Sequence, residues 1–251
     1  MSAQTRPLGL ICAIPEETAA LAGHFAGADR EEIAGFAFTS GRLDGRDVVM
    51  VEAGIGKVNA AVVGTLLLHR FGVGGLLFSG VAGGLDPALD VGDVVIADRL
   101  VQHDYGALAG GRLKPYQPGV PPLPGFDDTH GYALAQGLAL RIAAALDGVA
   151  LAGMPGTARA PVWRFGTVLT GDHFLNCADT RQDLHARFNA QAVEMEGAAL
   201  AQVADRFAVP LVVVRALSDL AGSDSHLDFP TFARTAAVNA AGIVRRIVPI
   251  F

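Results

Sequence analysis

The chain alternates short apolar runs with longer Ala-rich stretches of helical periodicity. Residues 8–14 are apolar throughout and residues 210–216 are rich in β-branched side chains, which is typical of strands buried on both faces. Further strands are predicted at 36–43, 47–53, 75–80, 94–101 and 164–170. Helices are predicted at 16–24, 57–71, 132–146, 197–207 and 229–248. This alternation predicts a single α/β domain over residues 1–251, with a central mixed β-sheet flanked by helices on both faces.

One segment, residues 104–129, breaks the alternation. It contains five prolines and five glycines and shows little periodicity. A loop of that length in a compact domain is usually a lid, a partner contact or a mobile connection. The sequence leaves these interpretations open.

The composition and charge of the chain argue against a disordered, a nucleic-acid-binding and a membrane-associated protein. The 251 residues are 51% hydrophobic and 18% charged, which excludes a disordered chain. The formal net charge of −6 argues against a nucleic-acid partner, because a phosphate backbone attracts basic surfaces. The longest stretch without Asp, Glu, Lys or Arg, residues 71–85, is too short to cross a bilayer and is interrupted by glycines, so no membrane association is expected.

The N-terminal region and the cysteines bear on the compartment. The first apolar stretch is short and is followed by Glu16 and Glu17, which is not the pattern of a secretory signal. The two cysteines, Cys12 and Cys177, lie far apart, so neither a disulfide framework nor a cysteine metal site is expected. Together these features favour a reducing cytoplasm.

Several familiar cofactor-binding and catalytic motifs are absent from the sequence. The segment Gly54-Ile55-Gly56-Lys57 is not a phosphate loop, because Val58 stands where a magnesium-binding Ser or Thr is needed. Nor is it a dinucleotide fingerprint, because Asn59 occupies the third glycine position. The chain has no G-x-S-x-G nucleophile motif, and its histidines have no zinc-site spacing. We therefore expect no cofactor and no metal.

Three acids stand out because charge is scarce around them. Glu17 follows the first predicted strand, Asp219 follows the strand at 210–216, and Glu196 lies where a strand gives way to a helix. Ligands of open α/β sheets bind beyond the carboxyl ends of strands. An alternative explanation for Glu17 and Glu196 is simpler, since acids are favoured in the first turn of any helix. Asp219 should be partly buried, and burial can raise the pKa of a carboxyl enough for it to donate a proton near neutrality.

Eight segments match, in order, the motifs of one known family. They are residues 9–17, 53–61, 79–85, 91–95, 103–104, 171–176, 192–196 and 214–219. The sixth contains Gly-Asp-His-Phe, the seventh reads Ala-Val-Glu-Met-Glu, and the last reads Val-Arg-Ala-Leu-Ser-Asp. With these segments the chain resembles the 5′-methylthioadenosine/S-adenosylhomocysteine nucleosidases of the nucleoside phosphorylase superfamily. The resemblance implies a nucleoside phosphorylase-like fold and hydrolysis of the bond between adenine and ribose.

The resemblance also implies roles for the acids. Asp219 would protonate adenine at N7, with Ser218 orienting it, so that the base leaves as a neutral molecule. Glu17 would activate the attacking water, as the second carboxylate does in inverting glycosidases. Glu196 would accept hydrogen bonds from the ribose hydroxyls, since a carboxylate suits a vicinal diol.

The remaining expected contacts are mostly apolar. The resemblance implies that Phe174 stacks on the purine, the Leu175 backbone reads its edge and Met195 packs on the ribose. Ile14 and Phe229 would line the pocket for the thioether arm. Ile55 and Val81 complete the expected set of substrate-binding residues.

The chain departs from the family pattern at several places. Ile14 replaces a common Met, Pro15 replaces an acid, and Val81 replaces a Ser near the ribose. The family resemblance implies a homodimer in which the loop at 104–129 lies near the interface or the site. Because that loop does not match the family, the preference for the 5′ substituent stays open.

Other functions remain as alternatives. A purine nucleoside phosphorylase would use phosphate in place of water, and would need cationic side chains that the segment around Val81 does not offer. A nucleosidase for another 5′-modified nucleoside, such as futalosine, is a second alternative. A non-catalytic nucleoside-binding protein is a third, against which the joint presence of the three acids argues.

Overall fold

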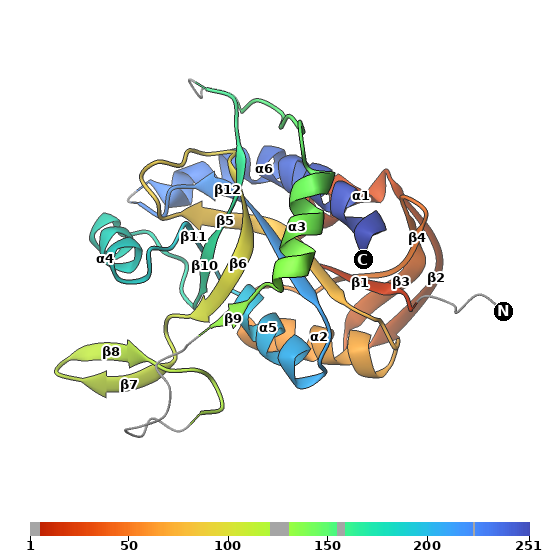
Figure 1. The fold of residues 1–251 in the computed structure, drawn as a ribbon, viewed down its shortest axis with the longest axis horizontal. Helices are drawn as coiled ribbons and strands as arrows, with labels where there is room; N and C mark the ends of the chain where they lie inside the picture. The colour runs from red at the N-terminus through yellow and green to blue at the C-terminus, as the bar shows by residue number, and fades with distance from the viewer. Residues whose placement is uncertain (1–5, 121–130, 155–158, 223) are drawn as a thin grey trace.

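The structure is a computed structural model that describes residues 6–120, 131–154, 159–222 and 224–251. The last part of the Pro- and Gly-rich loop, from residue 121 onward, lies outside the described residues. Its earlier part contains a hairpin of β7 (Gly106–Ala109) and β8 (Arg112–Pro115), which projects from the body of the molecule (Figure 1).

A mixed sheet of 10 strands forms the centre of the molecule, which confirms the predicted α/β fold class. Its strands in chain order are β1 (Leu8–Cys12), β2 (Phe25–Ile33), β3 (Phe36–Leu43), β4 (Arg46–Glu52), β5 (Leu76–Gly84), β6 (Val94–Gln102), β9 (Tyr132–Ala133), β10 (Trp163–Thr170), β11 (Ala192–Glu194) and β12 (Leu211–Asp219). The order across the sheet is β11-β10-β6-β12-β5-β1-β4-β3-β2, and β9 pairs with β6. Because β11 also pairs with β5, the strands β5, β12, β6, β10 and β11 close into a ring.

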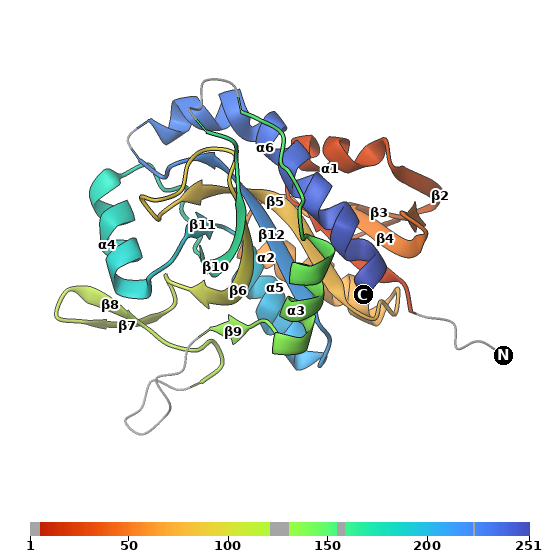
Figure 2. The same cartoon turned by 45° about the horizontal axis from the view of Figure 1, so that its top comes forward.

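Helices cover both faces of the sheet (Figures 1 and 2). They are α1 (Pro15–Ala22), α2 (Lys57–His69), α3 (Gln136–Ala145), α4 (Ala178–Phe188), α5 (Gly197–Arg206) and α6 (Ser225–Ile247), with a final 3₁₀ turn at Val248–Ile250. Helices α1, α3 and α6 pack on one face and α2 and α5 on the other. Alternate strand residues feed the two cores: Val212 and Val214 join the first, and Val213 joins the second. In the described part of the chain, no helix combines the length and apolarity that a bilayer crossing needs.

The structure differs from the sequence prediction mainly where elements are polar or short. The strand β2 and the helix α4 were not predicted, because both carry many charges and α4 buries only Leu184. The helix predicted from residue 132 begins at Gln136, since Tyr132 and Ala133 pair with the edge of β6. The last helix begins at Ser225 rather than at residue 229.

Strand pairing brings the expected site segments together. In the parallel pair of β5 and β12, Val81 lies opposite Ala216 and Gly83 opposite Asp219. Asp219 is the last residue of β12, so it belongs to the strand rather than following it. Strand β1 pairs in parallel with β5, and its end leads directly into α1. The carboxyl ends of β1, β5 and β12 therefore meet at one edge of the sheet.

Candidate active site

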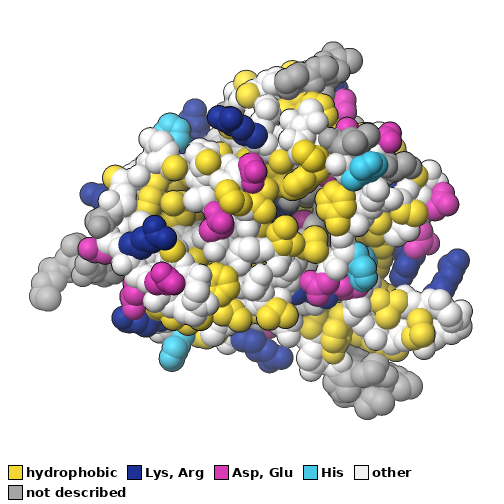
Figure 3. All heavy atoms as spheres, turned by 180° about the vertical axis from the view of Figure 1, so that it is seen from behind, with side chains coloured by type: hydrophobic (Ala, Val, Ile, Leu, Met, Phe, Trp, Pro, Cys, Tyr) yellow, Lys and Arg dark blue, Asp and Glu magenta, His cyan; other side chains and the backbone are white. Residues whose placement is uncertain are grey.

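A cavity of about 370 Å³ opens at this edge of the sheet. Figure 3 shows the molecule from behind, with hydrophobic side chains gathered around a hollow and acidic side chains among them. The cavity lining includes every residue that the sequence predicted for the site: Ile14, Glu17, Ile55, Val81, Phe174, Leu175, Met195, Glu196, Ser218, Asp219 and Phe229. The structure therefore brings together segments from the whole length of the chain. A volume of this size suits a small organic ligand.

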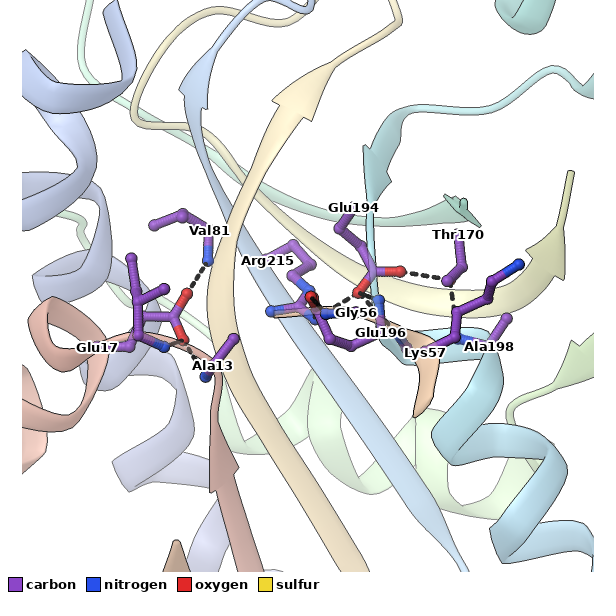
Figure 4. Close-up of polar contacts among 12 residues, drawn as sticks. Ala13, Glu17, Gly56, Lys57, Val81, Thr170, Glu194, Glu196, Ala198 and Arg215 are labelled. Atoms are coloured by element: carbon purple, nitrogen blue, oxygen red, sulfur yellow. Dashed lines mark hydrogen bonds and ion pairs between the residues drawn. The ribbon is translucent and has the colours of Figure 1, made fainter. Parts of the chain in front are cut away.

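Glu17 is buried in the first turn of α1 and accepts three backbone hydrogen bonds. One carboxylate oxygen accepts from Ala13 at 2.6 Å and from Ile14 at 3.3 Å, and the other accepts from Val81 at 3.0 Å (Figure 4). The first two bonds are the helix-start contacts that the simpler explanation expects. The third fixes the carboxylate against the neighbouring strand β5. Burial raises the pKa of Glu17, and the positive charge of Arg215 and these hydrogen bonds only partly offset the rise.

Arg215 is fully buried in β12 and is not among the site residues predicted from the sequence. It forms ion pairs with Glu194 and, at 3.4 Å, with Glu196, and its guanidinium lies 3.8 Å from the ring centre of Phe78. Figure 4 shows it between Glu17 on one side and the two other glutamates on the opposite side. Its Nε and Nη1 atoms have no hydrogen-bond partner among the described residues. A charged residue inside the β-branched run at 211–216 was the sequence signal that could have identified it.

Gly80 makes room for this guanidinium. A Cβ atom at position 80 would lie 1.8 Å from Arg215 Nη1 and 2.9 Å from a carboxylate oxygen of Glu17. Any larger residue would therefore displace Arg215 or Glu17.

Glu196 is the N-cap residue of α5 and is buried beside Arg215. Its carboxylate accepts a hydrogen bond of 2.8 Å from the backbone N–H of Gly56, in the loop before α2. Gly56 has a φ of 104°, which is available to glycine at little cost. Burial and then the neighbouring charge of Glu194 raise the pKa of Glu196 to about 7, although Arg215 acts in the opposite direction.

Glu194 is a second site residue that is absent from the set predicted from the sequence. It accepts hydrogen bonds from Thr170 and from the backbone N–H of Gly197 at 2.7 Å, in addition to its ion pair with Arg215. These contacts join β10, β11 and α5 behind the cavity. Glu194 therefore holds Arg215 in place from the side opposite to Glu17.

Asp219 has a different environment. It is buried, and its carboxylate accepts a hydrogen bond of 2.8 Å from the backbone N–H of Ala221 and one of 3.0 Å from the Ser218 hydroxyl. No ion pair reaches it within the described ranges of the chain. Burial raises its pKa, and the hydrogen bonds from Ala221 and Ser218 lower it by less.

The remaining wall of the cavity is apolar. The rings of Phe174 and Phe229 meet edge to face with their centres 5.9 Å apart, and Phe174 is 50% exposed. His173 and His226 also line the cavity and were not predicted. The imidazole of His226 lies 3.3 Å from the side-chain amide of Asn176, so the start of α6 contacts the loop before α4.

The described residues offer no metal-binding cluster of three or more His, Cys, Asp or Glu side chains. The carboxylates of the cavity are instead bonded to backbone N–H groups, hydroxyls and Arg215.

Several known proteins are similar to this chain over almost its whole length. A sequence profile of the phosphorylase superfamily matches residues 7–249. A 5′-methylthioadenosine/S-adenosylhomocysteine nucleosidase of Mycobacterium bovis is 47% identical over 97% of each chain. The structure of a nucleosidase of the same name from Colwellia psychrerythraea, in complex with adenine, is 34% identical with a TM-score of 0.83, over 98% of this chain and 96% of that one. A futalosine hydrolase of Helicobacter pylori is 26% identical with a TM-score of 0.84, over 98% of this chain and 99% of that one.

Proposed function

The chain belongs to the 5′-methylthioadenosine/S-adenosylhomocysteine nucleosidase family of the phosphorylase superfamily, and from that premise we propose that it hydrolyses the N-glycosidic bond of these nucleosides and releases adenine. The membership confirms the resemblance found in the sequence motifs. The observation that carries the proposed reaction is the convergence of Glu17, Glu196 and Asp219 on one cavity of about 370 Å³.

In the proposed reaction, Asp219 donates a proton to N7 of the adenine. Its raised pKa favours the protonated form, and Ser218 orients the carboxyl group. Protonation lets the base leave as a neutral molecule while the ribose gains positive charge. A well-placed acid of this kind contributes about 10²–10⁴ to the rate.

Glu17 acts on the opposite side as the base that removes a proton from the attacking water. Its raised pKa suits a base that works near neutral pH. Arg215 supports this step, because buried N–H groups without a partner are rare and a water between Arg215 and Glu17 would satisfy them. The proposal therefore adds Arg215 to the groups that hold the water.

Glu196 binds the ribose and the apolar wall binds the rest of the substrate. The carboxylate of Glu196 accepts hydrogen bonds from the ribose hydroxyls, and Met195 packs on the sugar. Phe174 stacks on the purine and the Leu175 backbone contacts its edge. Ile14 and Phe229 enclose the 5′ arm, and Ile55 and Val81 complete the wall.

A substrate panel tests the proposal. Methylthioadenosine, adenosylhomocysteine, futalosine, adenosine and inosine are incubated with the protein, with and without phosphate, and the free base is measured by chromatography. We expect adenine from the first two without phosphate. A requirement for phosphate would show a phosphorylase instead, and binding without base release would show a non-catalytic protein. Futalosine is included because the Helicobacter pylori futalosine hydrolase shares this fold at a TM-score of 0.84.

The proposed assembly is a homodimer formed through α2 and α5. Helix α2 buries Val63 and Leu67 against the sheet, yet it also exposes Val58 by 73% and Val62 by 38%. A surface helix that is apolar all round is usually covered. Phe207, at the end of α5, is 41% exposed and lines the same shallow surface. Light scattering should therefore give twice the chain mass of 25.9 kDa, and Val58→Asp should reduce it to the mass of one chain.

The proposed compartment is the cytoplasm. Cys12 and Cys177 are both free, and Cys177 is exposed. An exposed free thiol persists most readily in a reducing environment. Alkylation of the protein in intact cells, followed by mass spectrometry, should find Cys177 unoxidised.

A further inference from the structure

Three motif residues that the proposed chemistry does not use meet beside the cavity. They are Lys57 of the Gly-Ile-Gly-Lys segment, Asp104 of the His-Asp pair and Asp172 of the Gly-Asp-His-Phe segment. Lys57 Nζ lies 2.7 Å from Asp104 Oδ1 and 3.4 Å from Asp172 Oδ2. Two backbone hydrogen bonds complete the set: the Asp172 N–H donates to Asp104 at 2.8 Å, and the Lys57 N–H donates to Asp172 at 3.1 Å. We call these three residues the Lys57 cluster.

The Lys57 cluster joins two walls of the cavity to the sheet. Lys57 directly follows Gly56, whose N–H binds the carboxylate of Glu196. Asp172 comes shortly before Phe174 and Leu175, which line the cavity. Asp104 follows the end of β6, so it anchors both loops to the sheet. A change in the cluster would therefore alter the distance between the loop beside Glu196 and the loop that carries Phe174.

Burial and charge make the cluster stronger than an ordinary surface ion pair. The side chains of Lys57 and Asp104 are only 18% and 14% exposed, and that of Asp172 is 50% exposed. Burial alone would raise the pKa of Asp104, but the hydrogen bond from Lys57, the hydrogen bond from the Asp172 N–H and the charge of Lys57 together lower the pKa. Asp104 is therefore ionised at neutral pH. Hydrogen bonds between charged partners are shorter and stronger than those between neutral groups.

The stability of the neighbouring elements does not depend mainly on this cluster. Helix α2 is held by apolar residues that face the sheet, including Ala60, Val63 and Leu67. Neutralising Lys57 would leave these contacts intact. The expected loss is in the alignment of the two loops.

We propose that the residues of the Lys57 cluster are positioning residues. They hold the loop of Gly56, which binds Glu196, and the loop of Phe174 at a fixed separation, so that the bound nucleoside is aligned between the base and the acid of the site. The inference rests on the proposed nucleosidase function and deepens it. None of the three residues lines the cavity, so their effect on the reaction passes through Gly56 and through residues 173–175.

The test compares Lys57→Met, Asp104→Asn and Asp172→Asn with the wild type, using methylthioadenosine as substrate. We expect kcat to fall about 10–100-fold in Lys57→Met and Asp104→Asn, because misplacement by about 1 Å can cost this much. The double variant should be no slower than the slower single variant, since both changes break one contact. Asp172→Asn, at the more exposed position, should lose less and keeps the test valid if a more buried variant fails to fold.

The matched control is another ion pair, far from the cavity. Arg245, in the last turn of α6, pairs with Asp44 in the turn between β3 and β4 at 2.9 Å, with side chains 35% and 26% exposed. Arg245→Met should keep the wild-type kcat. The melting temperatures of the single and double variants of Lys57 and Asp104 are measured in parallel. A purely structural role would lower the melting temperature and kcat together.

The outcomes separate the cluster from the reaction itself. An active wild type together with full kcat in Lys57→Met and Asp104→Asn overturns the positioning role alone. A loss of kcat that is accompanied by a lower melting temperature overturns it as well and assigns the cluster to folding. A loss of kcat with a changed elution volume on size exclusion also overturns it and assigns the cluster to assembly. A wild type that cleaves none of the nucleosides overturns the proposed function and the positioning role with it.

Discussion

The two ends of the cavity use the same type of side chain in opposite surroundings. At the acid end, Asp219 is buried and receives hydrogen bonds from neutral groups, the Ala221 N–H and the Ser218 hydroxyl. At the Arg215 end, which comprises Arg215 with Glu17, Glu194 and Glu196, three carboxylates surround one buried cation. Burial raises the pKa of Asp219, Glu17 and Glu196 alike, but a buried, directly adjacent cation opposes the rise at the Arg215 end.

This difference shows how one residue type can serve as acid and as base in the same site. A buried carboxyl without an ion-paired cation holds its proton more tightly and can donate it. A buried carboxyl beside a guanidinium loses its proton more readily than it would without that charge, so it can accept a proton or a hydrogen bond. The contrast depends on the place of Arg215, which lies far from Glu17 in the sequence.

The strongest test of the acid end is Asp219→Asn. The amide fills the same space and can still hydrogen-bond, but it has no proton to give to the purine. We expect kcat for methylthioadenosine to fall by about 10³–10⁴ while adenine still binds, as measured by initial rates and by calorimetry. Near-normal turnover would show that Asp219 is not the acid and that the two ends do not differ in role.

The matching test of the Arg215 end is Glu17→Gln. It removes the base and keeps one of the two acceptor oxygens, so the N–H of either Val81 or Ala13 loses its acceptor, and we expect kcat to fall by about 10²–10⁴. Glu16→Gln is the control, because Glu16 is exposed and lies outside the cavity lining. Equal rates in the two variants would contradict the role of Glu17.

A third test moves the cation itself. Gly80→Ala places a methyl group against Arg215 Nη1 and Glu17, and we expect a loss of about 1–3 kcal/mol in the free energy of unfolding, together with reduced activity. Gly242→Ala is the control, since Gly242 lies in α6 with no atom within 4 Å of an added Cβ. It should gain up to about 1 kcal/mol through helix propensity. Chemical denaturation measures both, and an unchanged Gly80→Ala variant would show that Arg215 is not confined as described.

The last test concerns how far the charge of Arg215 lowers the pKa of the three carboxyl groups around it. The pKa of Glu196 is raised from 4.5 to about 7, so in the folded protein ionisation of this group costs stability as the pH rises through 7. Glutamine cannot ionise. We therefore expect Glu196→Gln to melt above the wild type at pH 8, by about 7 °C, with little difference near pH 4.5.

Thermal melts of both proteins between pH 4.5 and pH 8 test whether the pKa of Glu196 is raised. If Glu196→Gln is less stable than the wild type at pH 8, Arg215 compensates Glu196 fully and the pKa of that carboxyl is not raised. The Arg215 end would then hold fully ionised carboxylates even without a ligand.

Most of the fold followed from local pattern. The strands buried on both faces, such as β1 and β12, were predicted because two-sided burial leaves a continuous apolar run. The charged strand β2 and the polar helix α4 were not, because neither has an apolar face that repeats with a clear period. The hairpin of β7 and β8 was also missed, since its pairing depends on a partner strand rather than on periodicity.

The α/β class, the order of the buried strands and the acids near their carboxyl ends could be predicted from the amino-acid sequence, because a buried strand leaves a continuous apolar run in which an acid stands out. The place of Arg215 between Glu17 and the glutamates of residues 194 and 196, and the meeting of Lys57, Asp104 and Asp172, became visible in the folded chain alone. The electrostatic energy of a buried charge depends on its distance to other charges and on the solvent it loses. Those distances are set by how strands far apart in the chain pair with one another.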